Sequence, residues 1–254
     1  MTHKGIMAES NPSIRSKEVF CILAAGMGGR LEGLTSEINK ALLPIGNKPV
    51  ISYIIDKIPE DMDIIMSVGY QKDSLIEFCQ AAYPERNFVF VDVDGFNTKE
   101  TGPATGVWVC REYLQRPFYF CTNDCIVDEE YPDLSDNWIG VYPTSSPEIY
   151  STATIDEQGN VSDFVNKSEN GYDLAFIGVA GFKDYQTFWD ILDETYPTDK
   201  EIVAVFYHHD KFNPLKTKTF TWHDTGNIEA YEETVSKLCQ DRANIKKKLT
   251  NART

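Results

Sequence analysis

A glycine-rich stretch near the N-terminus combines residues that could hold a triphosphate. The run LAAGMGGR, residues 23–30, follows the apolar segment KEVFCILA and contains Gly26 and Gly28. Glycines let the backbone approach a phosphate or a base closely, and open α/β sheets bind ligands at the carboxyl ends of their strands. Arg30 closes the run, and Lys40 follows ten residues later. A guanidinium contacts phosphate in a bidentate manner and an ammonium supplies a mobile charge, so this pair could clamp a triphosphate from two sides.

The spacing of these glycines differs from the fingerprint of a dinucleotide-binding fold. That fingerprint has a third glycine three residues after the second, where this chain has Leu31. An alternative interpretation is a strand–turn–helix connection with basic residues on its surface. The glycines alone do not decide between the two.

Two aspartates each follow a segment with the pattern of a strand. Asp124 ends FYFCTND, and Asp224 comes after TKTFTW, in TWHDTGN. Because each would stand at a sheet edge, we expect them to meet there, and magnesium prefers carboxylate oxygens together with phosphate oxygens and water. The sequence therefore predicts a site for Mg²⁺, with Mn²⁺ as a substitute and no zinc. Asp224 could also cap the helix that follows it, a role that does not exclude metal binding.

A second glycine-bearing segment, TGPATG at residues 101–106, could face a nucleobase. Gly102 and Gly106 would let backbone groups meet the edge of a base, with Thr105 beside them. The alternative is an ordinary turn that starts a helix.

Composition and charge argue against several classes of partner. The 254 residues carry a net charge of −15 at pH 7, which repels nucleic acid and anionic membranes. No stretch comes near the ~18 apolar residues of a membrane span, and the polar N-terminus lacks the apolar centre of a signal peptide. The six cysteines show no C-x-x-C spacing, which favours reduced cysteines in the core of a cytoplasmic protein. We therefore expect no nucleic acid and no membrane as partners.

Apolar runs that alternate with helical stripes predict a sheet covered on both faces. In the first half the expected strands are residues 17–24, 63–69, 87–93 and 116–124, and the expected helices are 49–58, 72–83 and 105–114. In the second half we expect strands at 138–144, 175–182 and 217–222, a hairpin over 150–167 that turns at 157–160, and helices at 185–196, 201–209 and 228–240. The predicted fold class is α/β: a three-layer α/β/α sandwich with a mostly parallel mixed central sheet and a small antiparallel insertion.

Taken together, the motifs resemble those of one enzyme family. LAAGMGGRL, followed by KALLPI and KPVI, spans Leu23 to about Ile55 and is similar to the signature of nucleotidyltransferases that make activated sugars and CDP-alcohols. Glucose-1-phosphate thymidylyltransferase and phosphocholine cytidylyltransferase of bacterial cell-surface pathways are examples, with a Rossmann-like fold of the GT-A type. Many members have proline before the lysine, where this chain has Asn39. Residues 68–78 are similar to the second strand and helix of the family.

The resemblance implies roles for the residues that hold the nucleotide. It makes Arg30 and Lys40 the catalytic cations. It makes Asp124 and Asp224 the metal ligands, the second within a W-x-D-T-G motif. The residues that it assigns to nucleotide binding are Leu23, Ala24, Ala25, Gly26, Gly28, Gly29, Gly102, Thr105 and Gly106.

The resemblance also implies an acceptor site. The segment DFVNKSEN occupies the place of the family's E-K-P segment, whose acid contacts sugar hydroxyls and whose lysine contacts the substrate phosphate. Lys167 matches the lysine, but Asn166 replaces the acid and Ser168 the proline, which puts sugar recognition in doubt. Gly178, in the following strand, would let the acceptor approach, and Trp222 of the W-x-D-T-G motif would border it. Lys167 could instead be a solvated residue after a strand.

The implied reaction moves a nucleoside monophosphate from CTP, UTP or dTTP to a phosphate monoester and releases pyrophosphate. A sugar 1-phosphate is the first expectation, as a precursor of capsule or other cell-surface polysaccharide. An alternative acceptor is phosphocholine or another small phosphorylated alcohol or amide, whose cationic head would be bound by carboxylates or aromatic rings. A third alternative is a non-catalytic nucleotide sensor. The joint presence of the two cations and two carboxylates argues against it.

The polar N-terminal residues 1–17 are expected to be a disordered lead-in. The resemblance implies that residues 18–254 form a single nucleotidyltransferase domain. Within it, residues 18–128 would be the nucleotide-binding half and residues 129–254 the acceptor-binding half. A homo-oligomer and a functional link to a small-molecule kinase stay open.

Overall fold

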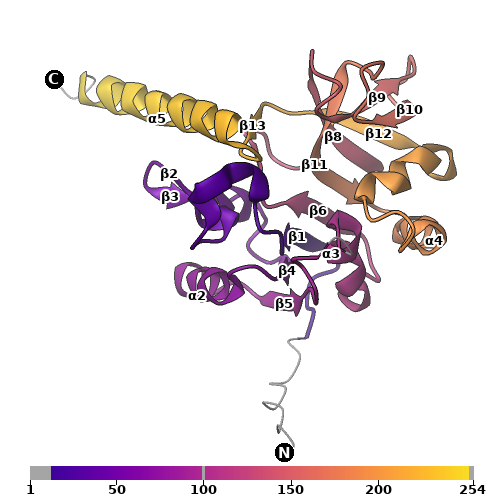
Figure 1. Cartoon of the computed structure of the whole chain (residues 1–254), viewed down its shortest axis with the longest axis horizontal. Coiled ribbons are helices and arrows are strands. Elements are labelled where there is room, and N and C mark those ends of the chain that lie inside the picture. The colour runs from indigo at the N-terminus through magenta and orange to yellow at the C-terminus, as the bar shows by residue number, and fades with distance from the viewer. Residues whose placement is uncertain (1–12, 99–100, 252–254) are drawn as a thin grey trace, which may run out of the picture.

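The computed structural model describes residues 13–98 and 101–251, and the first half of the chain builds four parallel strands (Figure 1). The strands are β1 (Val19–Ala24), β4 (Asp63–Val68), β5 (Phe88–Asp92) and β6 (Phe118–Thr122), in the spatial order β6-β1-β4-β5. The helices between them are α1 (Val50–Ile55), α2 (Lys72–Ala82) and α3 (Pro103–Val109). β1, β4 and β6 are buried on both faces, which explains their nearly continuous apolar sequences, whereas β5 at the edge is half-buried.

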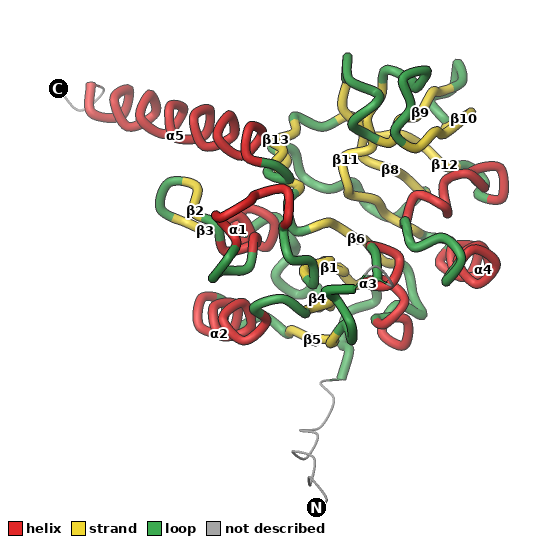
Figure 2. Tube along the Cα trace, viewed as in Figure 1, coloured by secondary structure: helices red, strands yellow, loops and turns green. Residues whose placement is uncertain are grey.

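A single strand joins this parallel half to the rest of the sheet. It is β11 (Leu174–Phe182), which pairs antiparallel with β6. On its other side it pairs antiparallel with β8 and β9. The remaining strands of this half are β8 (Asn137–Pro143), β9 (Ser151–Ile155), β10 (Val161–Asn166) and β12 (Leu215–Thr219). β9 and β10 form the predicted hairpin, and the predicted α/β fold with a mixed central sheet is confirmed (Figure 2).

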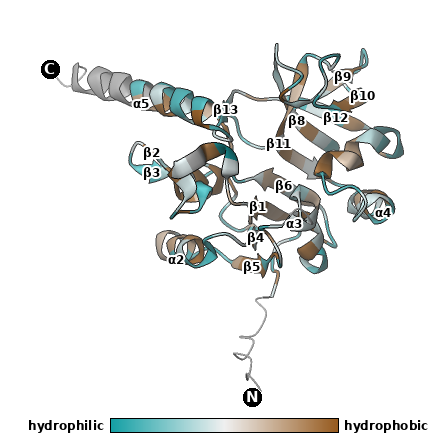
Figure 3. Cartoon of the chain, in the orientation of Figure 1, coloured by the Kyte–Doolittle hydropathy of each residue, from teal (hydrophilic) through white to brown (hydrophobic). Residues whose placement is uncertain are grey.

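Two apolar cores, one on each face of the sheet, produce the three layers. Successive residues of β1 alternate between them: Val19, Cys21 and Leu23 face one core, and Phe20, Ile22 and Ala24 face the other. The first core packs against α3 and α4 (Tyr185–Thr195), and the second against α1 and α2. Hydropathy colouring shows the apolar residues concentrated on the strands (Figure 3). All six cysteines are free and five are buried, which agrees with the sequence analysis.

Short elements at the carboxyl end of the parallel strands connect the two halves of the chain. β7 (Cys125–Val127) pairs antiparallel with β13 (Trp222–Asp224), so that Asp224 lies opposite Cys125. η1 (Gly29–Thr35) and η2 (Lys40–Leu42) are 3-10 helices, and β2 (Pro44–Ile45) pairs with β3 (Lys48–Pro49). The chain then ends in α5 (Ile228–Asn251), which projects from the body in Figure 1. None of the helices that the structure describes has the length and apolar character needed to cross a membrane.

Three predicted elements differ from what the structure contains. The single strand expected at 217–222 is two strands, β12 and β13, because Phe220 turns into the core between them. The helix expected at 201–209 is a 3-10 helix, η4 (Ile202–Lys211), interrupted at His208. The helix expected at 105–114 begins at Pro103 and ends early, and η3 (Arg111–Tyr113) follows it.

The N-terminal lead-in is described only in part, because residues 1–12 lie outside the described residues. The backbone N–H groups of Arg15 and Ser16 donate hydrogen bonds to the Asp63 carboxylate at the start of β4. The last residues of the lead-in are therefore held against the amino end of the sheet.

Candidate active site

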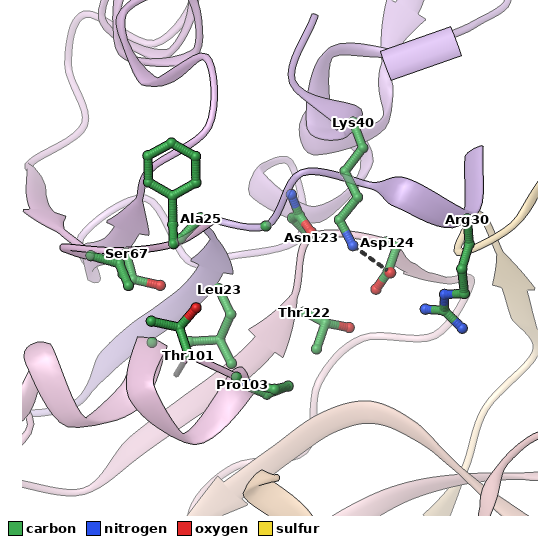
Figure 4. A pocket seen from close by; sticks show the side chains of 15 residues that line it. Leu23, Ala25, Arg30, Lys40, Ser67, Thr101, Pro103, Thr122, Asn123 and Asp124 are labelled. Carbon is green, nitrogen blue, oxygen red and sulfur yellow. Dashed lines mark hydrogen bonds and ion pairs between the residues drawn. The ribbon is translucent and has the colours of Figure 1, made fainter. Parts of the chain in front are cut away.

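A cleft of about 270 Å³ lies at the carboxyl ends of β1, β4 and β6 (Figure 4). Its walls come from the glycine loop after β1, from the end of β6, and from the segment that leads into α3. The lining residues are Leu23, Ala25, Gly26, Arg30, Lys40, Ser67, Val93, Phe96, Thr101, Gly102, Pro103, Gly106, Thr122, Asn123 and Asp124. All of them belong to the half of the chain predicted to bind nucleotide.

The glycine loop brings Lys40 close to the end of β1. Gly28 has a φ of 70°, a conformation that favours glycine. A Cβ added there would stand 3.0 Å from a side-chain carbon of Thr35 and 3.2 Å from Cβ of Lys40. The turn thus requires glycine and sets the position of Lys40. Cβ atoms added at Gly26 and Gly29 would meet nothing within 4 Å, so their backbones are open to a ligand.

Lys40 and Asp124 form an ion pair at the cleft. Lys40 Nζ lies 2.7 Å from Asp124 Oδ2, and the two side chains are only 16% and 15% exposed. Burial raises the pKa of Asp124, but the charge and hydrogen bond of Lys40, followed by a Thr122 hydrogen bond and the charge of Arg30, together lower it to about 2. Asp124 is therefore ionised at neutral pH. In Figure 4 the Arg30 guanidinium approaches the same carboxylate from the other side.

The antiparallel pair of β7 and β13 places Asp224 near Asp124 and Arg30. An added Cβ at Gly226 would stand 3.0 Å from Oδ1 of Asp224, 3.4 Å from Nη2 of Arg30 and 3.4 Å from Oδ2 of Asp124. These three charged groups therefore surround one small region. Sequence reasoning expected both aspartates at the edge of the main sheet. Only Asp124 directly follows one of its strands, and the β7–β13 pair positions Asp224, which comes from the second half of the chain.

The surroundings of Asp224 leave its charge poorly compensated. The Tyr150 hydroxyl donates to Oδ2 at 3.1 Å, and the Gly226 N–H donates to Oδ1 at 2.8 Å. Burial and the nearby negative charge of Asp124 raise the pKa of Asp224 above its usual value. The alternative role as a helix cap falls to another residue, because Asn227 Oδ1 accepts the N–H of Ala230 in the first turn of α5.

The donor set fits a magnesium ion shared with phosphates. Among the described residues no group of three or more His, Cys, Asp and Glu side chains could hold a metal alone. Two carboxylates that approach one region fit Mg²⁺, which usually binds one or two carboxylates and takes its other ligands from water and substrate phosphate. A cation there would also offset the repulsion that raises the pKa of Asp224.

The segment before α3 serves packing as well as lining the cleft. A Cβ at Gly102 would stand 2.5 Å from the Lys200 carbonyl oxygen, and one at Gly106 would stand 3.0 Å from Ser67 Oγ. Both glycines line the cleft, as the nucleobase interpretation requires. Thr105 is not among the lining residues, because it points back and its hydroxyl accepts the Gly102 N–H at 3.2 Å. Ala24 is also buried below the cleft rather than lining it.

The predicted acceptor residues lie on strands β10, β11 and β13. Asn166 pairs with Ser151 in the β9–β10 register, and its Oδ1 accepts the Ser151 hydroxyl at 2.7 Å. Lys167 follows, exposed and with a positive φ of 45°. Since Ser151 is next to Tyr150, whose hydroxyl bonds Asp224, the register directs Lys167 towards the end of the hairpin nearest the charged groups.

Gly178 and Trp222, the other two predicted acceptor residues, lie on β11 and β13. Gly178 has a φ of 87°, and an added Cβ would stand 2.4 Å from the hydroxyl oxygen of Thr122, which lines the cleft. The Trp222 ring packs against the rings of Tyr150 and Tyr142, at centroid distances of 5.3 Å and 6.0 Å. The Tyr150 hydroxyl bonds Asp224, so this group of aromatic rings lies beside the Asp224 carboxylate.

Sequence reasoning assigned no role to several residues around the cleft, and four of them are polar. Ser67, Thr122 and Asn123 line it. The Ser67 hydroxyl and both polar atoms of the Asn123 amide are buried and have no hydrogen-bond partner within the described residues. Their position in the chain, at the carboxyl ends of β4 and β6, was the signal that could have found them. The fourth, Asn39, immediately precedes Lys40, is completely buried and accepts the Ala41 N–H.

The fold and this arrangement of charges are those expected of a nucleotidyltransferase, and the comparison with known families agrees. Residues 20–241 match the family model described as nucleotidyl transferase. The match covers most of the chain, which therefore belongs to the nucleotidyl transferase family and is a nucleotidyltransferase by class. The predicted family and enzyme class are confirmed.

The curated relatives are longer than this chain. The bifunctional protein GlmU of Methanocaldococcus jannaschii is 24% identical over 234 residues, which cover 87% of this chain and 55% of that protein. GlmU of Methanococcus aeolicus is 27% identical over 216 residues, which cover 81% of this chain and 50% of that protein. The chain thus spans about half the length of the curated relatives that it matches.

One solved structure has the same fold over its whole length. The CTP:phosphocholine cytidylyltransferase of Streptococcus pneumoniae superposes with a TM-score of 0.74 at 19% identity, covering 88% of this chain and 100% of that one. At this identity the likeness supports the fold and leaves the substrates open.

Proposed function

We propose that this chain transfers a nucleoside monophosphate from an NTP to a small phosphate monoester and releases pyrophosphate. The observation that carries the proposal is the approach of Arg30, Lys40, Asp124 and Asp224 to one region at the mouth of the glycine-loop cleft. The cleft would hold the base and ribose, and the charged region would hold the phosphates. An oxygen of the acceptor phosphate attacks the α-phosphorus, the bond from that phosphorus to the bridging oxygen breaks, and pyrophosphate leaves with the electron pair.

The protein contributes positioning and charge rather than a covalent intermediate. Arg30, which has no ion-pair partner within the described residues, would hold the β- and γ-phosphates. Lys40 would neutralise the α-phosphate, and Lys167 would anchor the acceptor phosphate. Asp124 and Asp224 would hold Mg²⁺. When bound, that ion would supply positive charge that offsets the negative charge of the phosphates.

A sugar 1-phosphate is the acceptor that we place first, with CTP, UTP or dTTP as the donor. The product would be an activated precursor of capsule or other cell-surface polysaccharide, made in the cytoplasm. A homo-oligomer and a functional link to a small-molecule kinase are compatible with this role.

A cationic acceptor such as phosphocholine is the second candidate. The observation that favours it is the group of aromatic rings, Tyr142, Tyr150 and Trp222, beside the Asp224 carboxylate. Aromatic faces and carboxylates attract quaternary ammonium groups. The replacement of the expected acid by Asn166 also weakens the case for a sugar.

A two-way substrate screen tests the proposal. Pyrophosphate release would be measured for CTP, UTP, dTTP, ATP and GTP, each with glucose 1-phosphate, mannose 1-phosphate or phosphocholine, in Mg²⁺ and in excess EDTA. We expect release only where an NTP, an acceptor and Mg²⁺ are present together. Full release in EDTA would rule out the metal role, and release from NTP without any acceptor would point to hydrolysis instead.

A further inference from the structure

Asn39 is completely buried directly beneath the active site, and every polar atom of its side chain is used. Oδ1 accepts the backbone N–H of Ala41 at 2.9 Å. Nδ2 donates to the carbonyl oxygens of Ala24, at 3.1 Å, and Tyr70, at 2.7 Å. Its exposure is 0%. A buried amide with all its bonds made holds its neighbours in place, since a lost partner would leave a buried polar group unpaired.

The three partners belong to three segments that must keep their relative positions. Ala24 ends β1 and begins the glycine loop, Tyr70 follows β4, and Ala41 lies in the 3-10 helix that starts at Lys40. Tyr70 strengthens the connection, because its N–H donates to the Ala25 carbonyl at 3.0 Å and its hydroxyl donates to the Thr35 carbonyl at 2.8 Å. The Asn39 side chain thus links the backbone next to Lys40 with the glycine loop, where the phosphates would bind.

Lys40 needs such a support. Its ammonium stands at the end of a flexible four-carbon chain, and such side chains lose considerable rotamer entropy when they are fixed. Its Nζ reaches Asp124 Oδ2 at 2.7 Å, so a shift at the start of the 3-10 helix would move the charge away from the reacting phosphate. Asn39 has a φ of −63°, which proline also adopts, but proline would make none of the three side-chain bonds.

We propose that Asn39 is a positioning residue that fixes Lys40 relative to the glycine loop. The proposal rests on the proposed function, because it concerns the placement of Lys40 for nucleotidyl transfer. It predicts that removing the amide weakens the contribution of Lys40 and affects little else in the reaction.

A buried asparagine elsewhere in the fold provides a matched control. Asn137 is 1% exposed at the start of β8, donates to the Asp184 carboxylate at 2.7 Å and accepts the Asp184 N–H at 2.9 Å. It is not among the residues that line the cleft. Asn137→Ala therefore loses a buried amide without touching the site, and should lower the melting temperature while leaving kcat unchanged.

The experiment is a double-mutant cycle between Asn39→Ala and Lys40→Ala. Misplacing a catalytic group by an ångström can cost about a hundredfold, so Asn39→Ala should lower kcat by about tenfold to a hundredfold with Lys40 present. In the Lys40→Ala background the same change should alter kcat by less than about twofold, because coupled residues are not additive. Equal losses in the two backgrounds, or an equal loss in Asn137→Ala, would overturn the proposal.

NTP binding measured by calorimetry provides a second reading of the same cycle. Binding needs no turnover, so the cycle stays readable if the wild-type protein releases no pyrophosphate, an outcome that would contradict only the proposed function. We expect Asn39→Ala to weaken NTP binding only when Lys40 is present, and equal weakening in both backgrounds would count against the proposal. If the alanine variant does not fold, Asn39→Ser, which keeps an acceptor for the Ala41 N–H, takes its place in both cycles.

Discussion

Two aspartates at opposite ends of the sheet, Asp63, which is buried, and Asp224, which is half-buried, have opposite environments. Asp63, at the amino end of β4, accepts hydrogen bonds from the N–H and hydroxyl of Ser16, from the N–H of Arg15 and from the Asn87 amide. Burial raises the pKa of Asp63, but these hydrogen bonds together lower it below its usual value. Asp224, beside the carboxyl ends of the strands, faces a second carboxylate, and burial and that charge raise its pKa.

The difference is the one that we would expect between a structural carboxylate and a carboxylate of a ligand site. At the amino end the chain itself satisfies Asp63 with local donors. At the carboxyl end Asp224 lies near Asp124 and Arg30, and burial together with the charge of Asp124 disfavours its ionised form. Perturbed groups of this kind cluster at functional sites. The comparison predicts that a variant of Asp224 loses activity but keeps its stability, and that a variant of Asp63 loses stability but keeps its activity.

The largest loss of activity should come from the cations of the carboxyl end. Lys40→Ala and Arg30→Ala should each lower kcat by about 10²–10³-fold with the fold intact, because each removes charge that stabilises the transition state. Steady-state pyrophosphate release measures the loss, and circular dichroism checks the fold. Lys216→Ala, which removes a surface ion pair with Asp136, is the matched control and should keep full activity. Near-normal turnover in either site variant would remove that residue from the mechanism.

Asp224→Asn should impair chemistry without harming the fold. We expect kcat to fall by about a hundredfold, while NTP binding changes much less, because charge neutralisation matters most in the transition state. The free protein should keep its stability or gain some, because the repulsion with Asp124 is removed. Kinetics with each substrate varied, together with urea unfolding, measures both effects. A clear loss of stability would show that Asp224 is a structural residue like Asp63.

Asp63→Asn should give the reverse result. An asparagine can present only one acceptor oxygen to several donors, so we expect a loss of about 1–3 kcal/mol in the free energy of unfolding. At a temperature where the variant is folded, kcat should equal that of the wild type. Urea unfolding and pyrophosphate release measure the two quantities. A loss of turnover in the folded variant would contradict the division between the two ends.

The smallest effect is a difference in pH dependence between these two variants. Ionised Asp63 stabilises the fold above its ordinary pKa of 3.8, and this contribution is lost as the pH falls through its lowered folded-state pKa. Ionised Asp224 destabilises the free protein at neutral pH, and this penalty disappears as the pH falls through its raised pKa towards 3.8. On acidification the stability difference between wild type and Asp224→Asn should therefore vanish first. Urea unfolding at a series of pH values tests the order, and the reverse order would contradict the assigned environments.

Residue type and order along the chain predicted the parallel strands and the approach of four charged residues to one another. They did not predict that the pairing of β7 with β13 positions Asp224, because these strands are three residues each and too short to show a periodic pattern. The support of Lys40 was also hidden, since the Asn39 amide is satisfied by Tyr70, 31 residues further along the chain. Gly102 was interpreted as room for a base, and the close approach of the distant Lys200 carbonyl gives it a packing role as well. Each of these features depends on contacts between segments that no local pattern records.

The fate of each phosphate of the NTP is the most direct test of the proposed reaction. The donor and acceptor pair found by the substrate screen would be incubated with Mg²⁺ and the protein, using NTP labelled with ³²P at either the α- or the γ-phosphate. Attack at the α-phosphorus predicts that the α label enters the nucleotidylated acceptor and that the γ label leaves in pyrophosphate. Transfer of the γ label to the acceptor, or its release as inorganic phosphate, would contradict nucleotidyl transfer at this site.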